Sequence, residues 1–406
     1  MIANRLAQSG LRSIWWASSF SHQEKRHLDL SNAPATCGDG VELAFMHGRA
    51  YRANVSVSRL LNHREEAADF LRQAARRPRP DLIFCAYPTI DLAAASVAFG
   101  RRHAIPVVID VRDLWPEVFL DVSPLPRPLT RLALAPLYAR ARRALAGATA
   151  ITAITEPFLD AALALAGRER RADDRVVPLA YDRHAHDAAA IGAAERFWRE
   201  QGLRLDGSET IVCTFLNLSD VPRFDTLVGA LEHLPAGAAE SIRVVVAGSG
   251  VKLDWLKKAA SGDPRLIVPG RIGGAEISAL MRHAAAGLLP YPNRRDLLIS
   301  YPNKVGEFFS AGLPVISTLD GTTGALLRER DCGVVVPEDD PAALARAMAE
   351  LTGDEKARRR MSANAAAVFT EMFDAETVYG DLVDHLIDIT GRGASSSFDP
   401  SRATAY

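Results

Sequence analysis

The 406-residue sequence predicts an α/β fold made of two domains, each built around an open parallel sheet. Apolar runs with the length of strands alternate with stretches that have helical apolar spacing, which is typical of parallel sheets with helical crossovers. The alternation occurs twice, on either side of a polar, irregular stretch at 182–208. A chain of this length also exceeds what one hydrophobic core usually supports, so we expect each series to form its own domain.

The N-terminal series opens on the end of a helix, a stop at Gly10 and a short strand. This opening indicates a missing strand, and we expect the N-terminal domain to lack its first one. Small apolar residues at 91–104 suit a helix packed against the sheet. The expected strands are 13–17, 81–87, 106–111 and 148–155.

The C-terminal series repeats this architecture. Its expected strands are 209–216, 242–250, 265–272, 285–291, 313–318 and 332–337. Stretches with apolar spacing near the helical repeat lie between them, at 225–234, 275–284, 304–311 and 341–351. We therefore expect a second sheet covered by helices.

These patterns place the domain boundaries. We expect an N-terminal domain at 1–185 and a C-terminal domain at 186–372. The segment 373–390 is an amphipathic helix that we expect to pack back toward the N-terminal domain. The last segment, 391–406, lacks the apolar content needed for order, so we expect a disordered tail.

Composition excludes several classes of protein. Hydrophobic residues make up 48% and charged residues 24% of the chain, as in a globular protein. The 48 Lys and Arg nearly balance the 49 Asp and Glu, so no overall field indicates a nucleic-acid partner. No stretch reaches the ~18 apolar residues of a membrane helix, and the start lacks a signal peptide's apolar core, so we expect a cytoplasmic protein.

The four cysteines, at 37, 85, 213 and 332, lie far apart in the sequence. Neither the cysteines nor the histidines show the spacing of a metal site, and no two cysteines have the spacing of a redox pair. We expect no metal and no cofactor, and interpret the cysteines as reduced, buried core residues.

One segment, Ser300–Ser317, has the composition of an anion site. Ligands of open parallel sheets bind at the carboxyl ends of the strands, where helix N-termini offer free backbone N–H groups. A helix that begins near Asn303 would hold its N-terminus and the Lys304 ammonium beside an anion, while Glu307 could accept two hydroxyl hydrogen bonds. A nucleoside diphosphate has both features. A surface Lys–Glu pair without a ligand is the alternative.

The same segment resembles a known family. Residues Pro302 to Val336, followed by a helix at 339–351, are similar to the donor-binding half of family 4 glycosyltransferases, with their P-N-K, E and A-G-x-P-V pattern. The resemblance implies the GT-B fold, two Rossmann-like domains facing a central cleft. It also implies retaining transfer of a sugar from a nucleotide diphosphate donor. We expect a UDP-linked donor, with an N-acetylated sugar as one candidate.

The resemblance assigns roles on the donor side. Glu307 would bind the nucleotide ribose, and Lys304 would lie by the phosphates. Backbone groups near Arg271 and Ile272 would bind the base, although a plain β-turn is the alternative. The other expected donor-side residues are Ser300, Pro302 and Asn303 at the helix start, and Gly248 and Ser249 in the G-x-G turn after the apolar run 242–247.

The sequence departs from the family pattern at three positions. Ile299 stands where many members have a glutamate near the transferred sugar, and Leu216 and Ser219 stand where the family has glycines in a diphosphate-binding loop. Arg223 is the cation that remains in this loop, and its guanidinium could stabilise charge on the leaving phosphate. A solvated loop arginine is the alternative.

Two segments of the N-terminal half resemble the subgroup that assembles surface polysaccharides and lipid-linked oligosaccharides. Arg112 and Asp113 belong to a V-R-D-x-W-P segment after a buried strand, and Asp113 could orient or deprotonate the acceptor hydroxyl. A structural ion pair between the two is the alternative. His22, in the segment 18–25, is a candidate acceptor contact, or else a solvated histidine. The family's Gly-rich first loop has no counterpart here.

The segment 125–147 is a basic amphipathic stretch. Such a stretch can lie on anionic lipid, so the enzyme could be peripheral on the inner face of the plasma membrane, close to a lipid-linked or glycan acceptor. An ordinary helix with a solvated basic face is the alternative. The arginines of the stretch are Arg127, Arg131, Arg140, Arg142 and Arg143.

Two other functions remain open on the sequence. A nucleotide-sugar epimerase shares this architecture and would need no second substrate. An inactive scaffold that binds a nucleotide sugar or a partner transferase is the other possibility. The departures at Ile299, Leu216 and Ser219, together with the missing first strand, motivate the scaffold hypothesis.

Overall fold

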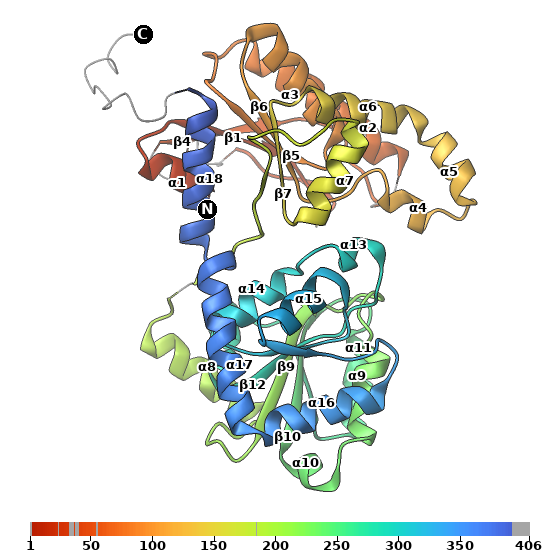
Figure 1. Cartoon of the computed structure of the whole chain (residues 1–406), viewed down its shortest axis with the longest axis vertical. Helices are drawn as coiled ribbons and strands as arrows, with labels where there is room; N and C mark the ends of the chain where they lie inside the picture. The colour runs from red at the N-terminus through yellow and green to blue at the C-terminus, as the bar shows by residue number, and fades with distance from the viewer. Residues whose placement is uncertain are drawn as a thin grey trace. The chain divides into compact units, whose positions relative to one another are not determined.

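The computed structural model describes residues 2–22, 24–31, 36, 40–53, 56–183 and 185–391. The chain divides into two compact units (Figure 1). The N-terminal unit comprises Met1–Pro178 and Val378–Tyr406, and the C-terminal unit comprises Leu179–Thr377. Beyond residue 391, the expected tail lies outside the described residues.

The N-terminal unit contains two parallel sheets. One is formed by β1 (Ser13–Ser18) and β4 (Val41–Met46), and a hairpin of β2 (Phe20–Ser21) and β3 (Arg26–His27) follows β1 directly. The other sheet has the order β5-β6-β7-β8, and no ladder joins it to β1 among the residues that the structure describes. Its strands are β5 (Ile83–Tyr87), β6 (Val107–Val111), β7 (Ala150–Ala153) and β8 (Arg175–Val176).

Side chains on helices connect these two sheets. Trp16 of β1 contacts Phe70 edge-on, with ring centroids 5.0 Å apart, and Phe70 contacts Phe99 at 6.2 Å. Phe70 lies on α2 (Val57–Ala74) and Phe99 on α3 (Ile90–His103), and α3 packs beside β5. Three aromatic rings therefore link β1 to the larger sheet through two helices.

The remaining helices of this unit surround the sheets. The last of them, α18, buries Leu382 and Leu386, and its His385 Nε2 lies 2.9 Å from the carbonyl oxygen of Asp173. The helices are α1 (Ile2–Gln8), α4 (Val118–Val122), α5 (Arg127–Ala133), α6 (Ala135–Gly147), α7 (Glu156–Ala166) and α18 (Ala375–Ile389).

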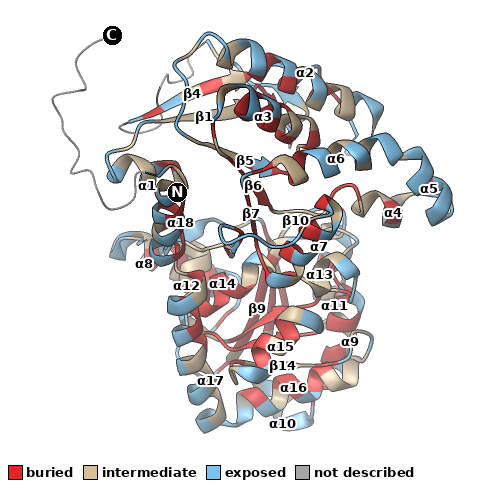
Figure 2. Cartoon of the chain, turned by 45° about the horizontal axis from the view of Figure 1, so that its top comes forward, coloured by how far each residue is buried: buried red, intermediate tan, exposed pale blue. Residues whose placement is uncertain are grey.

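The C-terminal unit is built on one six-stranded parallel sheet with the order β11-β10-β9-β12-β13-β14. The chain adds β10 and β11 on one side of β9 and then crosses to add β12 on the other, so the strand order reverses beside β9. Figure 2 shows the central strands of this sheet as buried. The strands are β9 (Thr210–Asn217), β10 (Ile242–Ser249), β11 (Leu266–Gly270), β12 (Ala284–Leu289), β13 (Val315–Ser317) and β14 (Gly333–Val335).

Two hydrophobic cores lie on the two faces of this sheet. Cys213 and Phe215 of β9 belong to one core, which includes Phe308, and Val212 belongs to the other, which includes Leu227. Successive strand residues point to opposite faces, so one strand serves both cores. The helices are α8 (Ala188–Glu200), α9 (Phe224–Glu232), α10 (Ala236–Ser241), α11 (Leu253–Gly262), α12 (Gly274–His283), α13 (Arg295–Leu298), α14 (Asn303–Ser310), α15 (Gly321–Glu329), α16 (Pro341–Gly353) and α17 (Glu355–Val368), with a π-helical turn at Phe369–Phe373.

These parallel sheets and their covering helices confirm the predicted α/β fold class. The sequence analysis identified neither β4 nor α2, both of which lie in the stretch between residues 18 and 80 that it left without elements. Among the cysteines, Cys85, Cys213 and Cys332 are free and buried, and burial raises the pKa of Cys85 and of Cys332 to about 11. Cys37 lies outside the described residues.

Close packing at Gly287 of β12 gives a prediction for stability. A Cβ added there would lie 2.5 Å from the ring of the buried Phe308, so Gly287→Ala should lower the free energy of unfolding by roughly 1–3 kcal/mol. Gly262→Ala is the control, because a Cβ at that helical position meets nothing within 4 Å. Urea denaturation measures both. Equal free energies of unfolding for the two variants would contradict the prediction, because they would show that the Phe308 ring can move aside without loss of stability.

Candidate functional site

Polar side chains gather at the carboxyl ends of the strands in the C-terminal unit. They follow β9, β12, β13 and β14, which are neighbours in the sheet. The carboxyl ends of parallel strands share one edge, and ligands of open sheets bind at that edge near the point where the strand order reverses. This edge is therefore the candidate site of the unit.

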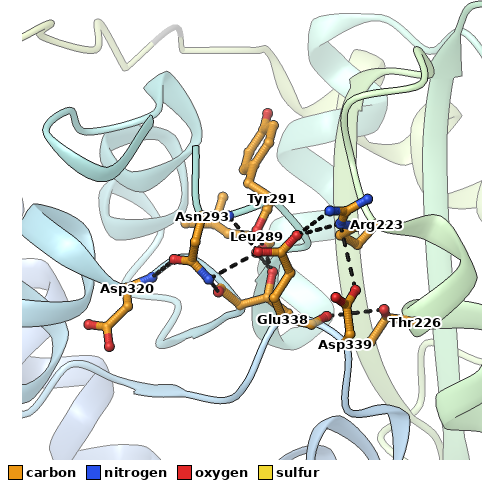
Figure 3. A network of polar contacts seen from close by, with 9 residues as sticks. Arg223, Thr226, Leu289, Tyr291, Asn293, Asp320, Glu338 and Asp339 are labelled. Atoms are coloured by element: carbon orange, nitrogen blue, oxygen red, sulfur yellow. Dashed lines mark hydrogen bonds and ion pairs between the residues drawn. The ribbon is translucent and has the colours of Figure 1, made fainter. Parts of the chain in front are cut away.

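Asn293, which follows β12, is the centre of a hydrogen-bond network at this edge (Figure 3). Its backbone N–H donates to Glu338 Oε2 at 2.7 Å, and its side-chain amide donates to the carbonyl oxygen of Thr318 at 3.1 Å. Its amide oxygen accepts from the backbone N–H of Asp320 at 2.8 Å. One side chain thus ties together the segments after β12, β13 and β14.

Glu338 connects this network to the segment after β9. Its carboxylate accepts a hydrogen bond from Arg223 Nε at 2.5 Å, and its carbonyl oxygen accepts from the Thr226 hydroxyl at 3.1 Å. Burial alone would raise the pKa of Glu338, but hydrogen bonds from Asn293 and the Arg223 charge outweigh burial and lower this pKa. Glu338 therefore stays ionised beside the guanidinium.

Arg223 is thus held by carboxylates rather than simply solvated. Besides Glu338, Asp339 lies 3.7 Å from its Nε. The guanidinium side chain is still 43% exposed. The sequence analysis identified Arg223 but missed Asn293 and Glu338, although each is a polar residue just after a predicted strand.

Helix α14 begins at Asn303, where the sequence predicted a helix start. Asn303 is exposed and Pro302 precedes it as the N-cap residue. Lys304 Nζ lies 2.5 Å from Glu307 Oε2, and the ammonium also lies 4.5 Å from the centroid of the Phe215 ring. The Lys304–Glu307 pair therefore sits above the end of β9, next to the exposed start of α14.

The surroundings of this pair are mostly apolar. Glu307 is only 8% exposed. Burial and the charge of Glu307 raise the pKa of Tyr181 to about 12, so the phenol stays neutral beside the carboxylate. The backbone N–H of Tyr181 donates to the carbonyl oxygen of Phe373 at 2.8 Å, which holds Tyr181 in position. The sequence analysis missed this residue.

The other expected donor-side residues occupy different surroundings. The Ser300 hydroxyl donates to the carbonyl oxygen of Leu297 at 3.2 Å, and Ser300 is buried. Ile272 packs against the core, while Arg271 is exposed just after Gly270, whose φ is +88°. In the described geometry the Ser300 hydroxyl shapes the bend before α14, and Arg271 and Ile272 lie in a turn after β11.

The end of β10 at Gly248 and Ser249, and the turn that follows at Gly250, have a packing reason for their glycines. A Cβ at Gly248 would lie 1.9 Å from the carbonyl oxygen of Leu216, and one at Gly250 would lie 2.4 Å from that of Leu218. Their φ angles are +147° and +151°, which L-residues rarely adopt. The turn therefore packs tightly on the end of β9, and it leaves Ser249 exposed.

In the N-terminal unit, Arg112 and Asp113 follow β6. Arg112 Nε donates to Asp110 Oδ2 at 2.5 Å, and the Thr152 hydroxyl donates to Asp110 Oδ1 at 2.7 Å. Asp113 Oδ1 accepts from the backbone N–H of Leu114 at 2.8 Å. Arg112 is thus anchored to the sheet by Asp110, a partner that the sequence analysis did not consider.

His22 lies in the turn of the β2–β3 hairpin. Its Nδ1 lies 2.7 Å from the Tyr51 hydroxyl. Burial, followed by the charges of Arg59 and Lys25, lowers the pKa of His22. This histidine is therefore part of an ordered cluster of side chains. The sequence analysis missed Tyr51 and Arg59, which lie outside the motifs that it recognised.

The stretch 125–147 forms α5, α6 and the turn before them. Leu125, Leu129 and Leu132 are 52%, 55% and 73% exposed. Arg131 pairs with Glu117, and Arg140 pairs with Asp91. In the part of the chain that the structure describes, no helix combines the length and apolar character required to cross a bilayer.

Comparisons with known families decide the identity of this fold. Residues 210–354 match the family described as glycosyl transferases group 1, and residues 31–182 match the family described as a glycosyl transferase 4-like domain. The chain belongs to the group 1 glycosyltransferases. This assignment confirms the predicted family and the prediction of a transferase. No curated protein matches the sequence of this glycosyltransferase.

Solved structures show the same fold at low sequence identity. Anabaena HepE in complex with UDP is 17% identical, with 86% of each chain covered and a TM-score of 0.59. Sucrose-phosphate synthase from Thermosynechococcus elongatus is 15% identical, with 96% of this chain and 92% of that chain covered and a TM-score of 0.70. WaaG, described as a glycosyltransferase involved in lipopolysaccharide biosynthesis, is 14% identical, with 95% and 94% covered and a TM-score of 0.61. These likenesses confirm the GT-B type of fold.

The lowered pKa of Glu338 gives a prediction for stability against pH. A carboxyl group whose pKa is lower in the folded than in the unfolded protein stabilises the fold above the ordinary glutamate range. This contribution is lost as the pH falls through the lowered value. Glu338→Gln should therefore lower the free energy of unfolding by roughly 1–2 kcal/mol at pH 7, and by progressively less as the pH falls.

Urea denaturation of both proteins across acid and neutral pH measures this difference. Glu350→Gln, at an exposed position on α16, is the control and should leave stability unchanged at every pH. If the difference in free energy of unfolding between Glu338→Gln and the unsubstituted protein stayed constant or grew as the pH fell, Glu338 would not be the ionised group proposed here.

Proposed function

We propose that this glycosyltransferase is a retaining enzyme that moves a sugar from a UDP-linked donor to a lipid-linked or polysaccharide acceptor in cell-envelope glycan biosynthesis. The observation that carries the proposal is the Lys304–Glu307 pair at the exposed start of α14, at the ligand-binding edge of the sheet. HepE structures with UDP and with UDP-glucose support the donor class, and WaaG supports the acceptor class. An N-acetylated sugar remains one candidate for the transferred group.

In this proposal, the donor binds along the edge from α14 toward β9. The Glu307 carboxylate accepts hydrogen bonds from the ribose hydroxyls. The diphosphate lies by the Lys304 ammonium and the first backbone N–H groups of α14, where the helix dipole favours negative charge. Backbone groups at Arg271 and Ile272 bind the base, and Ser249 lies in the neighbouring turn. No metal or cofactor is assigned a role.

Charge on the leaving group is the main quantity to stabilise in this reaction. The bond from the anomeric carbon to the phosphate oxygen breaks, a bond to the acceptor oxygen forms, and the diphosphate leaves with added negative charge. Preorganised cations lower this barrier because they need no reorganisation at the moment of transfer. Lys304 and Arg223 supply the cations, and Asp113 accepts the acceptor hydroxyl's proton or orients the hydroxyl.

The proposal predicts how two substitutions change donor affinity. Glu307→Ala and Lys304→Ala should each weaken UDP binding at least about tenfold, because a charge-assisted hydrogen bond contributes about 1.5–3 kcal/mol and 1.4 kcal/mol is a factor of ten. Calorimetric titration with UDP measures the affinity. The matched controls are Glu350→Ala and Lys257→Ala, both at exposed positions of the same unit.

A panel of nucleotide sugars tests the reaction itself. Slow hydrolysis of one donor by the purified protein, lost in Lys304→Ala, would support a transferase and name the donor. Interconversion of a free nucleotide sugar would instead favour an epimerase. UDP affinity unchanged in both variants would contradict the proposed donor site.

We also propose that the enzyme acts in the cytoplasm, at the surface of an anionic membrane. The exposed Leu129 and Leu132 lie on α5, and the exposed Arg142 and Arg143 lie on the neighbouring α6. Apolar side chains beside cations suit the interface of an anionic bilayer. A lipid-linked acceptor would then be held near the enzyme.

Substitution on α5 tests this contact. Leu129→Glu combined with Leu132→Glu should abolish sedimentation with phosphatidylglycerol vesicles, since carboxylates neither insert into the interface nor approach anionic headgroups. Val251→Glu is the control, because Val251 is 75% exposed and lies in the other unit. Vesicle binding equal to that of the unsubstituted enzyme would contradict the membrane contact.

A further inference from the structure

Four basic side chains of the N-terminal unit converge on two aromatic rings. His22 and Lys25 come from the turn of the β2–β3 hairpin, and Arg59 and His63 come from the first two turns of α2. The rings are those of Tyr51, which follows β4, and Trp115, which follows β6. The cluster therefore stands at the carboxyl ends of β1, β4 and β6, where open parallel sheets bind ligands.

Short contacts join the members of this cluster. His22 Nδ1 lies 2.7 Å from the Tyr51 hydroxyl and 3.5 Å from Lys25 Nζ. The Lys25 ammonium lies 5.1 Å, and the Arg59 guanidinium 5.9 Å, from the centroid of the Tyr51 ring. Tyr51 thus joins the hairpin turn to α2.

The second ring completes the arrangement. The Arg59 guanidinium lies 4.6 Å from the centroid of the Trp115 ring, and the His63 ring centroid lies 5.8 Å from it. Arg59 and His63 are one helical turn apart, so both project from the same face of α2. The Arg59 guanidinium therefore approaches both aromatic rings.

The positive charges of this cluster disfavour the protonated forms of its histidines. Burial, followed by the charges of Arg59 and His22, lowers the pKa of His63 to about 4. Burial and then Arg59 also lower the pKa of Lys25. Like charges gathered at this distance destabilise the charged forms, and an anion placed among them would reverse that effect.

Carboxyl groups also lie on the segments that carry this cluster. Glu66 accepts a hydrogen bond from the Ser18 hydroxyl at 2.5 Å, and burial raises its pKa, which favours its neutral form. Glu24 of the hairpin pairs with Arg26 at 2.8 Å. Asp113, two residues before Trp115, is the proposed partner of the acceptor hydroxyl.

The backbone at Lys25 adopts a conformation that is unusual for a lysine. Its φ is +56°, in the left-handed region where glycine is preferred. Its backbone N–H donates to the carbonyl oxygen of Ser21 at 2.8 Å, which closes the hairpin turn. A lysine at such a position costs stability, and strained residues of this kind cluster at functional sites.

From this arrangement we infer that the His22–Lys25–Arg59–His63 cluster binds a phosphate or diphosphate group carried by the acceptor. The inference rests on the proposed transferase function and adds the chemistry of its acceptor. A guanidinium, an ammonium and two imidazoles present more donors than a carboxylate can use, and they suit the several oxygens of a phosphoryl group. The N-terminus of the 18-residue α2 adds positive potential at the same place.

Titration with inorganic pyrophosphate tests the cluster directly. The full chain is first saturated with UDP, and the Cε1–H NMR signals of His22 and His63, assigned with His22→Gln and His63→Gln, are then followed. Pyrophosphate should shift both signals and raise both pKa values. The dissociation constant should rise at least about tenfold in Arg59→Gln, because a charge-assisted contact is lost.

Two further variants separate binding from folding. Arg64→Gln removes the same charge from an exposed position of α2 and should leave pyrophosphate binding unchanged. Lys25→Gly should raise the melting temperature, since glycine relieves the positive φ, and should still weaken pyrophosphate binding. Equal affinity in Arg59→Gln, Lys25→Gly and Arg64→Gln would overturn the inference, as would the absence of any histidine shift.

The source of the phosphoryl group is distinguished by competition. Farnesyl diphosphate and glucose 1-phosphate are each tested for displacement of pyrophosphate from the histidines. If farnesyl diphosphate displaces pyrophosphate at the lower concentration, the inference is supported and the acceptor is lipid-linked. If glucose 1-phosphate does so, the inference is supported and the acceptor is a sugar phosphate. Displacement by neither overturns it. Failure of UDP to bind would instead count against the proposed donor site, because the histidine signals report on the other unit.

Discussion

In the C-terminal unit, the hydrogen bonds of Asn293 fix the edge of the sheet at which the donor is proposed to bind. The outer strands β13 and β14 have three residues each, so their ladders supply few backbone bonds. Asn293 and Glu338 add side-chain bonds just beyond the strand ends. Because Glu338 also holds Arg223, the position of that cation depends on the same network.

The two units treat positive charge differently. At the edge of the C-terminal sheet, Lys304 and Arg223 each have a carboxylate partner, which keeps them ordered and limits the cost of holding a cation there. In the N-terminal unit, Arg59 lies among other basic groups and aromatic rings.

Local patterns predicted what depends on neighbours in the sequence. Apolar periodicity gave most strands, and the Lys304–Glu307 spacing of three residues needed only a helix start at Asn303. Contacts between distant segments could not be predicted in this way. Arg223 and Glu338 are 115 residues apart, and their contact depends on the order of the strands. Arg59 and His63 look like ordinary polar residues of a surface helix until Tyr51 and Trp115 are placed beside them.

The link between β1 and the larger sheet of the N-terminal unit runs through the rings of Trp16, Phe70 and Phe99. Contacts between rings tolerate small rotations and sliding, whereas a backbone ladder fixes the register of its strands. The hairpin directly after β1 carries His22 and Lys25, so the position of these two side chains relative to the larger sheet depends on that ring packing.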